Sequence, residues 1–137
     1  MAVFIVDASV ALAWCFADEA TPWTDGLLER LRRGDRIVVP AHWPTEVANA
    51  LLMGRRRNRI QPGQPELLWD ELAALPIEVE PALSAAQARG VLALSEKHGL
   101  TVYDGAYLEL ARRRQLPLGT LDGDLRKAAQ AEGLAML

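Results

Sequence analysis

Short apolar runs alternate along the chain with longer segments in which apolar residues recur every three or four positions. The short runs predict strands at residues 3–6, 36–40, 77–79, 118–121 and 134–137. The run at 3–6 is wholly apolar, which is typical of a strand buried on both faces of a parallel sheet. The longer segments have the periodicity of amphipathic helices.

N-capping residues, prolines in the first turn and glycines at the end place these helices. The predicted helices cover residues 10–16, 22–33, 44–53, 62–75, 84–98, 104–114 and 122–131. Ser9 is the predicted N-cap of the first helix. Ser84 and Gln87 have the spacing of a capping box at the start of the fifth.

Strands therefore alternate with single or paired helices over the whole chain. Parallel strands need such connections, and right-handed crossovers place helices on both faces of the sheet. We predict the α/β class, as a three-layer α/β/α sandwich with a mainly parallel central sheet. With 137 residues, half of them hydrophobic, the chain suits one compact domain over residues 1–137.

Charge and cysteine content narrow the function. The formal net charge is −3, so binding to a nucleic acid would depend on local basic groups or on a metal ion. Cys15 is the only cysteine, which excludes an internal disulfide and a thiolate-rich zinc site. No apolar run reaches the ~18 residues that span a bilayer, and the start of the chain lacks the features of a signal peptide. We expect a cytoplasmic protein without membrane contact.

Four acidic residues stand where a strand or an apolar segment gives way to a helix: Asp7, Glu46, Asp104 and Asp122. The carboxyl ends of parallel strands meet at one edge of the sheet, so these side chains are expected to converge there. Each aspartate alone could simply cap a helix. Several carboxylates together are unfavourable without a cation, because like charges repel and each loses hydration. The spacing therefore predicts a site for Mg²⁺ or Mn²⁺.

The residues around the acids carry a resemblance to a known family. They form four blocks, in an order and at a spacing that extend over essentially the full chain: Ile5–Val10, Glu46–Leu51, Tyr103–Ala111 and Thr120–Leu125. With these blocks the chain resembles PIN-domain ribonucleases, in particular the VapC toxins of bacterial toxin–antitoxin pairs. Gly105 departs from the alanine expected after the third acid, a difference that concerns helix packing.

The resemblance implies a metal-dependent endoribonuclease that acts as a toxin. The implied catalytic residues are Asp7, Glu46, Asp104 and Asp122, and the implied metal ligands are Asp7, Asp104, Asp122 and Asp124. Supporting polar positions are Ser9, Asn49 and Thr120. The implied partners are an RNA substrate, transfer or ribosomal RNA being the usual targets, a cognate VapB-type antitoxin, and a second copy of the chain in a homodimer.

The residue types also predict the chemistry. Metal-assisted attack by water leaves a 5′-phosphate and a 3′-hydroxyl end. No histidine pair or lysine is positioned to drive attack by the RNA 2′-hydroxyl, and neither His42 nor His98 has a metal-ligand partner at helical spacing.

Basic and aromatic residues allow more than one interpretation. Arginines cluster at Arg55, Arg56, Arg57 and Arg59. They could contact the RNA backbone, or only favour the end of the helix dipole and solubility. The four tryptophans are expected in the core, with a dimer interface or an antitoxin groove as the alternative.

Two alternatives to a toxin stay open. The chain could be a PIN nuclease of RNA processing, or a PIN-like scaffold that binds RNA or a protein without cleavage. A scaffold, however, has no reason to keep four mutually repelling acids. A phosphatase of the haloacid-dehalogenase type would need a second aspartate where Ser9 stands.

Overall fold

A parallel sheet forms the middle of the computed structural model, which describes residues 1–137. Its strands lie in the order β3-β2-β1-β4 and every neighbouring pair is parallel. Their bounds are β1 (Val3–Val6), β2 (Arg36–Val39), β3 (Ile77–Val79) and β4 (Leu118–Gly119). The predicted parallel sheet is therefore confirmed.

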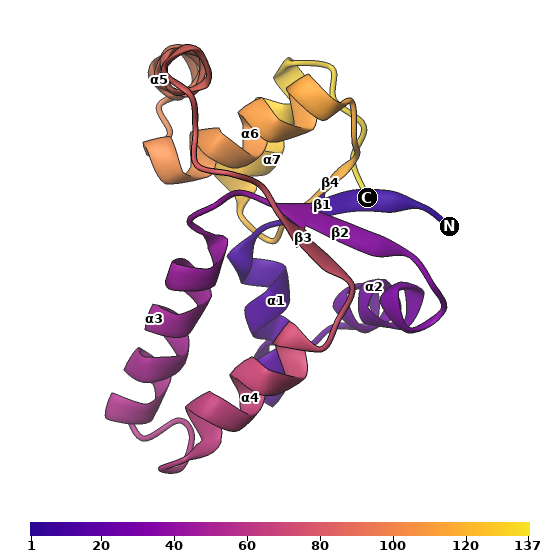
Figure 1. The fold of residues 1–137 in the computed structure, drawn as a ribbon, viewed down its shortest axis with the longest axis vertical. Coiled ribbons are helices and arrows are strands. Elements are labelled where there is room, and N and C mark those ends of the chain that lie inside the picture. The colour runs from indigo at the N-terminus through magenta and orange to yellow at the C-terminus, as the bar shows by residue number, and fades with distance from the viewer.

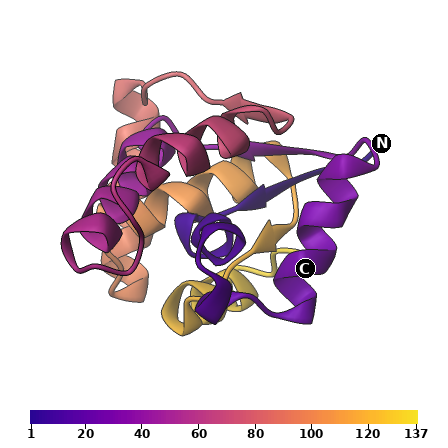
Figure 2. The same ribbon diagram turned by 90° about the horizontal axis from the view of Figure 1, so that it is seen from below.

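Helices cover both faces of the sheet (Figure 1). One layer contains α1 (Ala8–Cys15), the short 3₁₀ helix η1 (Ala17–Glu19), α2 (Pro22–Arg32), α3 (Trp43–Arg56) and α4 (Gln64–Ala73). The other contains α5 (Ala85–His98), α6 (Val102–Arg114) and α7 (Gly123–Ala131). Seen from below, α1 lies in front of the sheet with α2 and α3 on either side (Figure 2). The three-layer α/β/α sandwich is confirmed.

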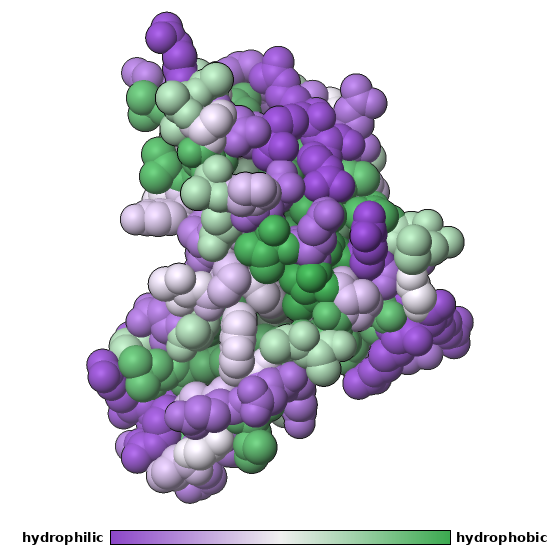
Figure 3. All heavy atoms as spheres, in the orientation of Figure 1, coloured by the Kyte–Doolittle hydropathy of each residue, from purple (hydrophilic) through white to green (hydrophobic).

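The two central strands form the core, as their wholly apolar runs predict. Phe4, Ile5 and Val6 of β1 have no exposed surface, and neither has the run Ile37–Val39 of β2. Burial on both faces is what a parallel strand between two helical layers requires. β3 is one of the two edge strands, and its Val79 is exposed. Apolar side chains gather across the middle of the face seen in Figure 1 (Figure 3).

Several predicted boundaries are confirmed by the capping interactions. Thr21 caps α2 with Pro22 in its first turn, and Ser84 and Gln87 form the predicted capping box of α5. The helix predicted over 62–75 is shorter, because Gly63 precedes it in the left-handed conformation with φ 84°. The third helix is longer than predicted and continues to Arg56.

Four local predictions are wrong. Asp7, not Ser9, is the N-cap of the first helix, because its carboxylate accepts the Val10 N–H and the helix already begins at Ala8. The helix predicted to begin at Asp104 begins two residues earlier, at Val102, with Thr101 as its cap. β4 ends at Gly119, and the strand predicted at 134–137 is reduced to one parallel bridge between Leu118 and Met136.

None of the helices combines the length and the apolar character that a membrane crossing needs.

Candidate active site

The chain places β2 and β3 on one side of β1 and β4 on the other, so the direction in which strands are added to the sheet changes at β1. In open parallel sheets, ligands bind beyond the carboxyl ends of the strands at such a switch point. Asp7 follows β1 directly, and the segment Thr120–Asp122 follows β4. The topology therefore brings these two segments, more than a hundred residues apart in the sequence, to one crevice.

Asp7 is the most deeply buried of the four acids, with 5% of its surface exposed. One carboxylate oxygen accepts hydrogen bonds from the Ser9 hydroxyl and the Val10 N–H, and the other accepts one from the Thr120 hydroxyl. Thr120 has no exposed surface. Ser9 and Thr120, both predicted as supporting positions, thus orient this carboxylate from two elements.

The same two hydroxyls also hold the segment that leads to Asp122. The Ser9 hydroxyl accepts the Leu121 N–H at 3.0 Å, and the Thr120 hydroxyl accepts the Asp122 N–H at 2.9 Å. Asp122 is the N-cap of α7, and its Oδ1 accepts the N–H groups of Asp124 and Leu125. Its Oδ2 has no such bond and is available to a ligand.

Glu46 and Asp104 come from opposite helical layers, and each lies in the first turn of its helix, α3 or α6. The buried hydroxyl of Tyr107 donates to Glu46 Oε1 at 2.7 Å. Each of the four acids therefore stands at the N-terminal end of a different helix. Four helix dipoles direct their positive ends toward the negative charges, which stabilises them in part.

All four acids line one cavity of about 240 Å³, together with five other residues: Ala8, Ser9, Leu12, Ala50 and Tyr107. No lysine or arginine lines it. Burial raises the pKa of Asp7 to about 6, although its hydrogen bonds from Ser9 and Thr120 lower it. Loss of hydration, and then the charges of Asp122 and Glu46, raise the pKa of Asp104. The cavity therefore holds negative charge that no protein cation offsets.

This donor set fits a hard divalent cation such as Mg²⁺ or Mn²⁺. The ligand atoms are carboxylate oxygens, which such ions prefer, and a cation would remove the repulsion that raises the Asp104 pKa. No three of the His, Cys, Asp and Glu side chains lie close enough together to enclose an ion by themselves. That openness suits Mg²⁺, which retains several waters and is commonly held by one or two carboxylates.

Other residues singled out in the sequence lie outside the cavity. Asn49 is exposed on α3, and the cavity is lined instead by Ala50, four residues after Glu46. Asp124 is exposed on α7. Arg55, Arg56 and Arg57 stand at the far end of α3 from Glu46, roughly 14 Å along the helix axis at 1.5 Å per residue.

Arg59 already has partners within the protein. Its guanidinium contacts Asp18 at 2.9 Å and Glu19 at 2.8 Å and lies over the Phe16 ring at 4.1 Å. Arg59 therefore links the C-terminal end of α3 to η1. This structural role leaves it less suited than Arg55–Arg57 to contact with RNA.

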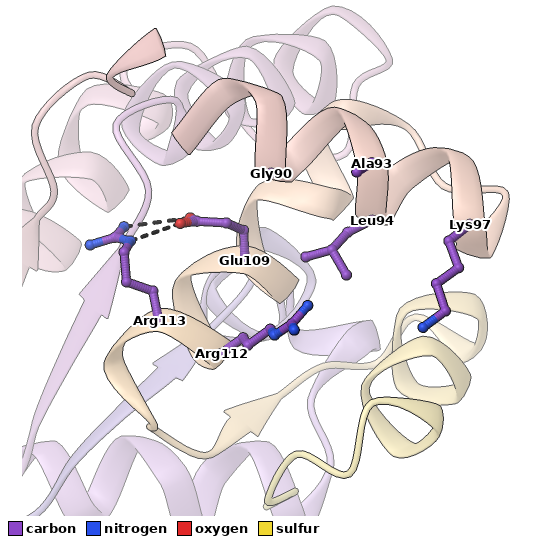
Figure 4. A pocket seen from close by; sticks show the side chains of 7 residues that line it. All are labelled: Gly90, Ala93, Leu94, Lys97, Glu109, Arg112 and Arg113. Atoms are coloured by element: carbon purple, nitrogen blue, oxygen red, sulfur yellow. Dashed lines mark hydrogen bonds and ion pairs between the residues drawn. The ribbon is translucent and has the colours of Figure 1, made fainter. Parts of the chain in front are cut away.

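A larger cavity, about 490 Å³, lies elsewhere, between α5 and the C-terminal half of α6 (Figure 4). Its cations are paired: Arg113 contacts Glu109 at 2.7 Å, and Lys97 and Arg112 contact Glu132 at 2.7 and 3.5 Å. It contains none of the four acids. We place the candidate site in the smaller acidic cavity because its charges are not satisfied.

Tyr107 lines the cavity and His42 lies beside Glu46 without lining it, and neither was assigned to the site from the sequence. Tyr107 follows Asp104 by three residues on α6, so its place on the same helix face was a usable signal. His42 is the residue that precedes α3, and its Nε2 lies 3.9 Å from Oε1 of Glu46 in the first turn of that helix. Both contacts converge on Glu46.

The chain is thus an α/β/α protein with four carboxylates beside the switch point of its parallel sheet. The chain belongs to the PIN domain family, which matches residues 4–131. It is 31% identical over 131 residues to ribonuclease VapC12 of Mycobacterium tuberculosis, covering 96% of this chain and 93% of that one. It is 30% identical over 125 residues to ribonuclease VapC3 of Pyrobaculum aerophilum, covering 88% and 90%.

Solved structures show the same fold. PAE2754 from Pyrobaculum aerophilum superposes with a TM-score of 0.73 at 23% identity, covering 99% of this chain and 92% of that one. The complex VapBC2 from Rickettsia felis, bound to a DNA fragment from its promoter, contains a chain with a TM-score of 0.69 at 14% identity, with coverages of 98% and 97%.

Proposed function

We propose that this protein is a metal-dependent endoribonuclease and the toxin of a toxin–antitoxin pair. The observation that carries the proposal is the acidic cavity at the switch point, where four carboxylates meet without a protein cation. Relatives named as VapC ribonucleases, aligned over nearly the whole chain, support RNA as the substrate. A non-catalytic scaffold would be more stable without this charge.

We propose that Asp7, Asp104 and Asp122 hold Mg²⁺ or Mn²⁺, in part through waters that the ion retains. When bound, the cation supplies the positive charge that makes a water more acidic and offsets charge on the phosphate. Glu46 accepts a proton from the attacking water. The water oxygen forms a bond to phosphorus, the bond from phosphorus to the 3′-oxygen breaks, and the 3′-oxygen takes up a proton. The products carry 5′-phosphate and 3′-hydroxyl ends.

Removal of the metal is expected to stop cleavage reversibly. Purified protein incubated with transfer and ribosomal RNA should cut in Mg²⁺ or Mn²⁺, lose the activity in excess EDTA, and regain it when the ion is restored. Sequencing of the fragments with and without prior 5′-phosphorylation identifies the ends. Cleavage that resists EDTA, or 2′,3′-cyclic phosphate ends, would contradict the mechanism.

Asp122 and Asp124 provide a matched pair of substitutions. Asp122 lines the cavity and Asp124 is exposed outside it. Asp122→Asn keeps a good N-cap, because asparagine caps helices as well as aspartate does. It should still lower the cleavage rate by about 100-fold through loss of a metal ligand. Asp124→Asn should lower the rate by less than about 3-fold. Equal losses in single-turnover assays would make Asp124 a ligand as well.

We also propose a cognate VapB-type antitoxin as the partner, a homodimer as the oligomeric state, and the cytoplasm as the location. The antitoxin is supported by the VapBC2 complex, one chain of which shares this fold. Expression of the protein alone should arrest growth, and co-expression with its cognate VapB-type antitoxin should restore growth. Growth that continues after induction of an active ribonuclease would favour a role in RNA processing.

A further inference from the structure

Glu46 and Tyr107, which both line the acidic cavity, are joined by a hydrogen bond. Glu46 belongs to α3 and Tyr107 to α6, in opposite helical layers and 61 residues apart. The phenol donates to Glu46 Oε1 at 2.7 Å, and Tyr107 has no exposed surface. A buried donor of this kind has a fixed position, whereas the Glu46 side chain remains about one-third exposed. The phenol therefore restrains the more mobile partner.

Tyr107 and His42 both approach the same oxygen of Glu46. His42 Nε2 lies 3.9 Å from Oε1, is buried, and has no hydrogen-bond partner. The His42 ring also packs edge-on against the Tyr107 ring, with centroids 5.3 Å apart. These contacts occupy the Oε1 side of the carboxylate and leave Oε2 without a bond from the protein.

The Tyr107 phenol stays protonated throughout the physiological pH range. Burial, and then the negative charge of Glu46, raise the pKa of Tyr107 far above its usual value. Tyr107 is therefore a hydrogen-bond donor throughout the physiological pH range and does not add a further negative charge to the four carboxylates of the cavity.

We infer that Tyr107 is a positioning residue, whose phenol holds Glu46 by Oε1 so that Oε2 is the oxygen that acts in the cavity. The inference rests on the proposed nuclease function. Tyr107 touches neither metal nor RNA in this role and acts only through Glu46. Groups that orient a catalytic or metal-binding side chain typically contribute about 10- to 100-fold to affinity or activity.

The chain offers a matched control, because it has two tyrosines and both lie on α6. Tyr103 is 61% exposed beside Asp104, so Tyr103→Phe removes a hydroxyl from the same helix without touching Glu46. Tyr107→Phe should lower kcat by about 10-fold and leave KM for RNA unchanged. Mn²⁺ affinity, measured by the loss of the free-ion electron paramagnetic resonance signal, should be unchanged, because Glu46 is proposed as the proton acceptor and not as a metal ligand. Tyr103→Phe should leave Mn²⁺ affinity and kcat within about 2-fold of wild type.

A double-mutant cycle separates positioning from general support of the fold. In a Glu46→Ala background, Tyr107→Phe should cause no further loss of kcat, because the residue through which Tyr107 acts is gone. An equal loss in both backgrounds, or an unfolded Tyr107→Phe protein at the assay temperature, would make the phenol structural and overturn the inference. If the wild type neither binds Mn²⁺ nor cuts RNA, the proposed function fails; if it does both and Tyr107→Phe matches it, only the inference fails.

Discussion

Asp7→Asn should abolish RNA cleavage and at the same time make the metal-free protein more stable at neutral pH. Asp7 is a proposed metal ligand at the centre of the cavity, so its loss should lower the cleavage rate about 1,000-fold or more. Asparagine has the same shape and is an equally good N-cap for α1. The change therefore removes charge while leaving the local fold in place.

The gain in stability follows from the pKa of Asp7, which burial raises from 3.8 to about 6. Between these two values the folded protein holds the proton more tightly than the unfolded chain does. The contribution of this group to stability is thus fully present below pH 3.8 and is lost as the pH rises through 6. The difference between these two pKa values corresponds to roughly 3 kcal/mol. Asparagine avoids this loss because it never ionises.

Thermal denaturation in EDTA at two pH values tests the prediction. Asp7→Asn should raise the free energy of unfolding by about 1–3 kcal/mol at pH 7.5, and should have little effect near pH 4. Asp25→Asn is the control, because Asp25 is an exposed residue in the first turn of α2. A destabilised Asp7→Asn protein at pH 7.5 would show that the Asp7 charge is already offset within the metal-free fold.

The sequence was sufficient to predict that the four acids converge, because each stands at the start of a helix and parallel topology directs such starts to one edge. It was not sufficient to orient α3. Glu46 with Asn49 predicted one polar face, but the helix turns Ala50 toward the cavity and Asn49 toward solvent. Rotation about a helix axis depends on tertiary packing, here against α1 and α4, and Val47 and Leu51 of α3 are fully buried or nearly so.

Long-range contacts account for most of what local patterns missed. The hydrogen bond from Tyr107 to Glu46 depends on how α3 and α6, which belong to opposite helical layers, approach each other at the acidic cavity. The pairing of Arg59 with Asp18 depends on where η1 lies, 41 residues earlier in the chain. The predicted strand at 134–137 has only a bridge because β4 offers two residues before the chain turns to place Thr120 at Asp7.

Gly105→Ala should destabilise the protein, although alanine is the residue expected there from the family resemblance and is the better helix former. A Cβ at Gly105 would overlap the Ser95 hydroxyl and would lie 3.2 Å from Ser95 Cβ and 3.3 Å from the Val91 carbonyl oxygen. Ser95 cannot rotate freely, because its hydroxyl donates to that same carbonyl at 2.6 Å. Helices α5 and α6 must therefore separate. Overpacking of this kind costs about 1–3 kcal/mol beyond the gain in helix propensity.

Gly90→Ala is the control that separates packing from propensity. Gly90 lies on α5 of the same helix pair, but a Cβ there meets only the Glu109 side chain, at 3.9 Å. Denaturant unfolding should therefore show Gly90→Ala stabilised by about 0.5–1 kcal/mol, as expected for replacing glycine within a helix. In a Ser95→Ala background the cost of Gly105→Ala should fall by about half, because the hydroxyl overlap is gone and the backbone contact remains.

Because Asp104 precedes Gly105, the Gly105→Ala variant should also bind Mn²⁺ more weakly, and adding Ser95→Ala should partly restore the affinity. Equal stability of Gly105→Ala and wild type would mean that the two helices can separate without cost.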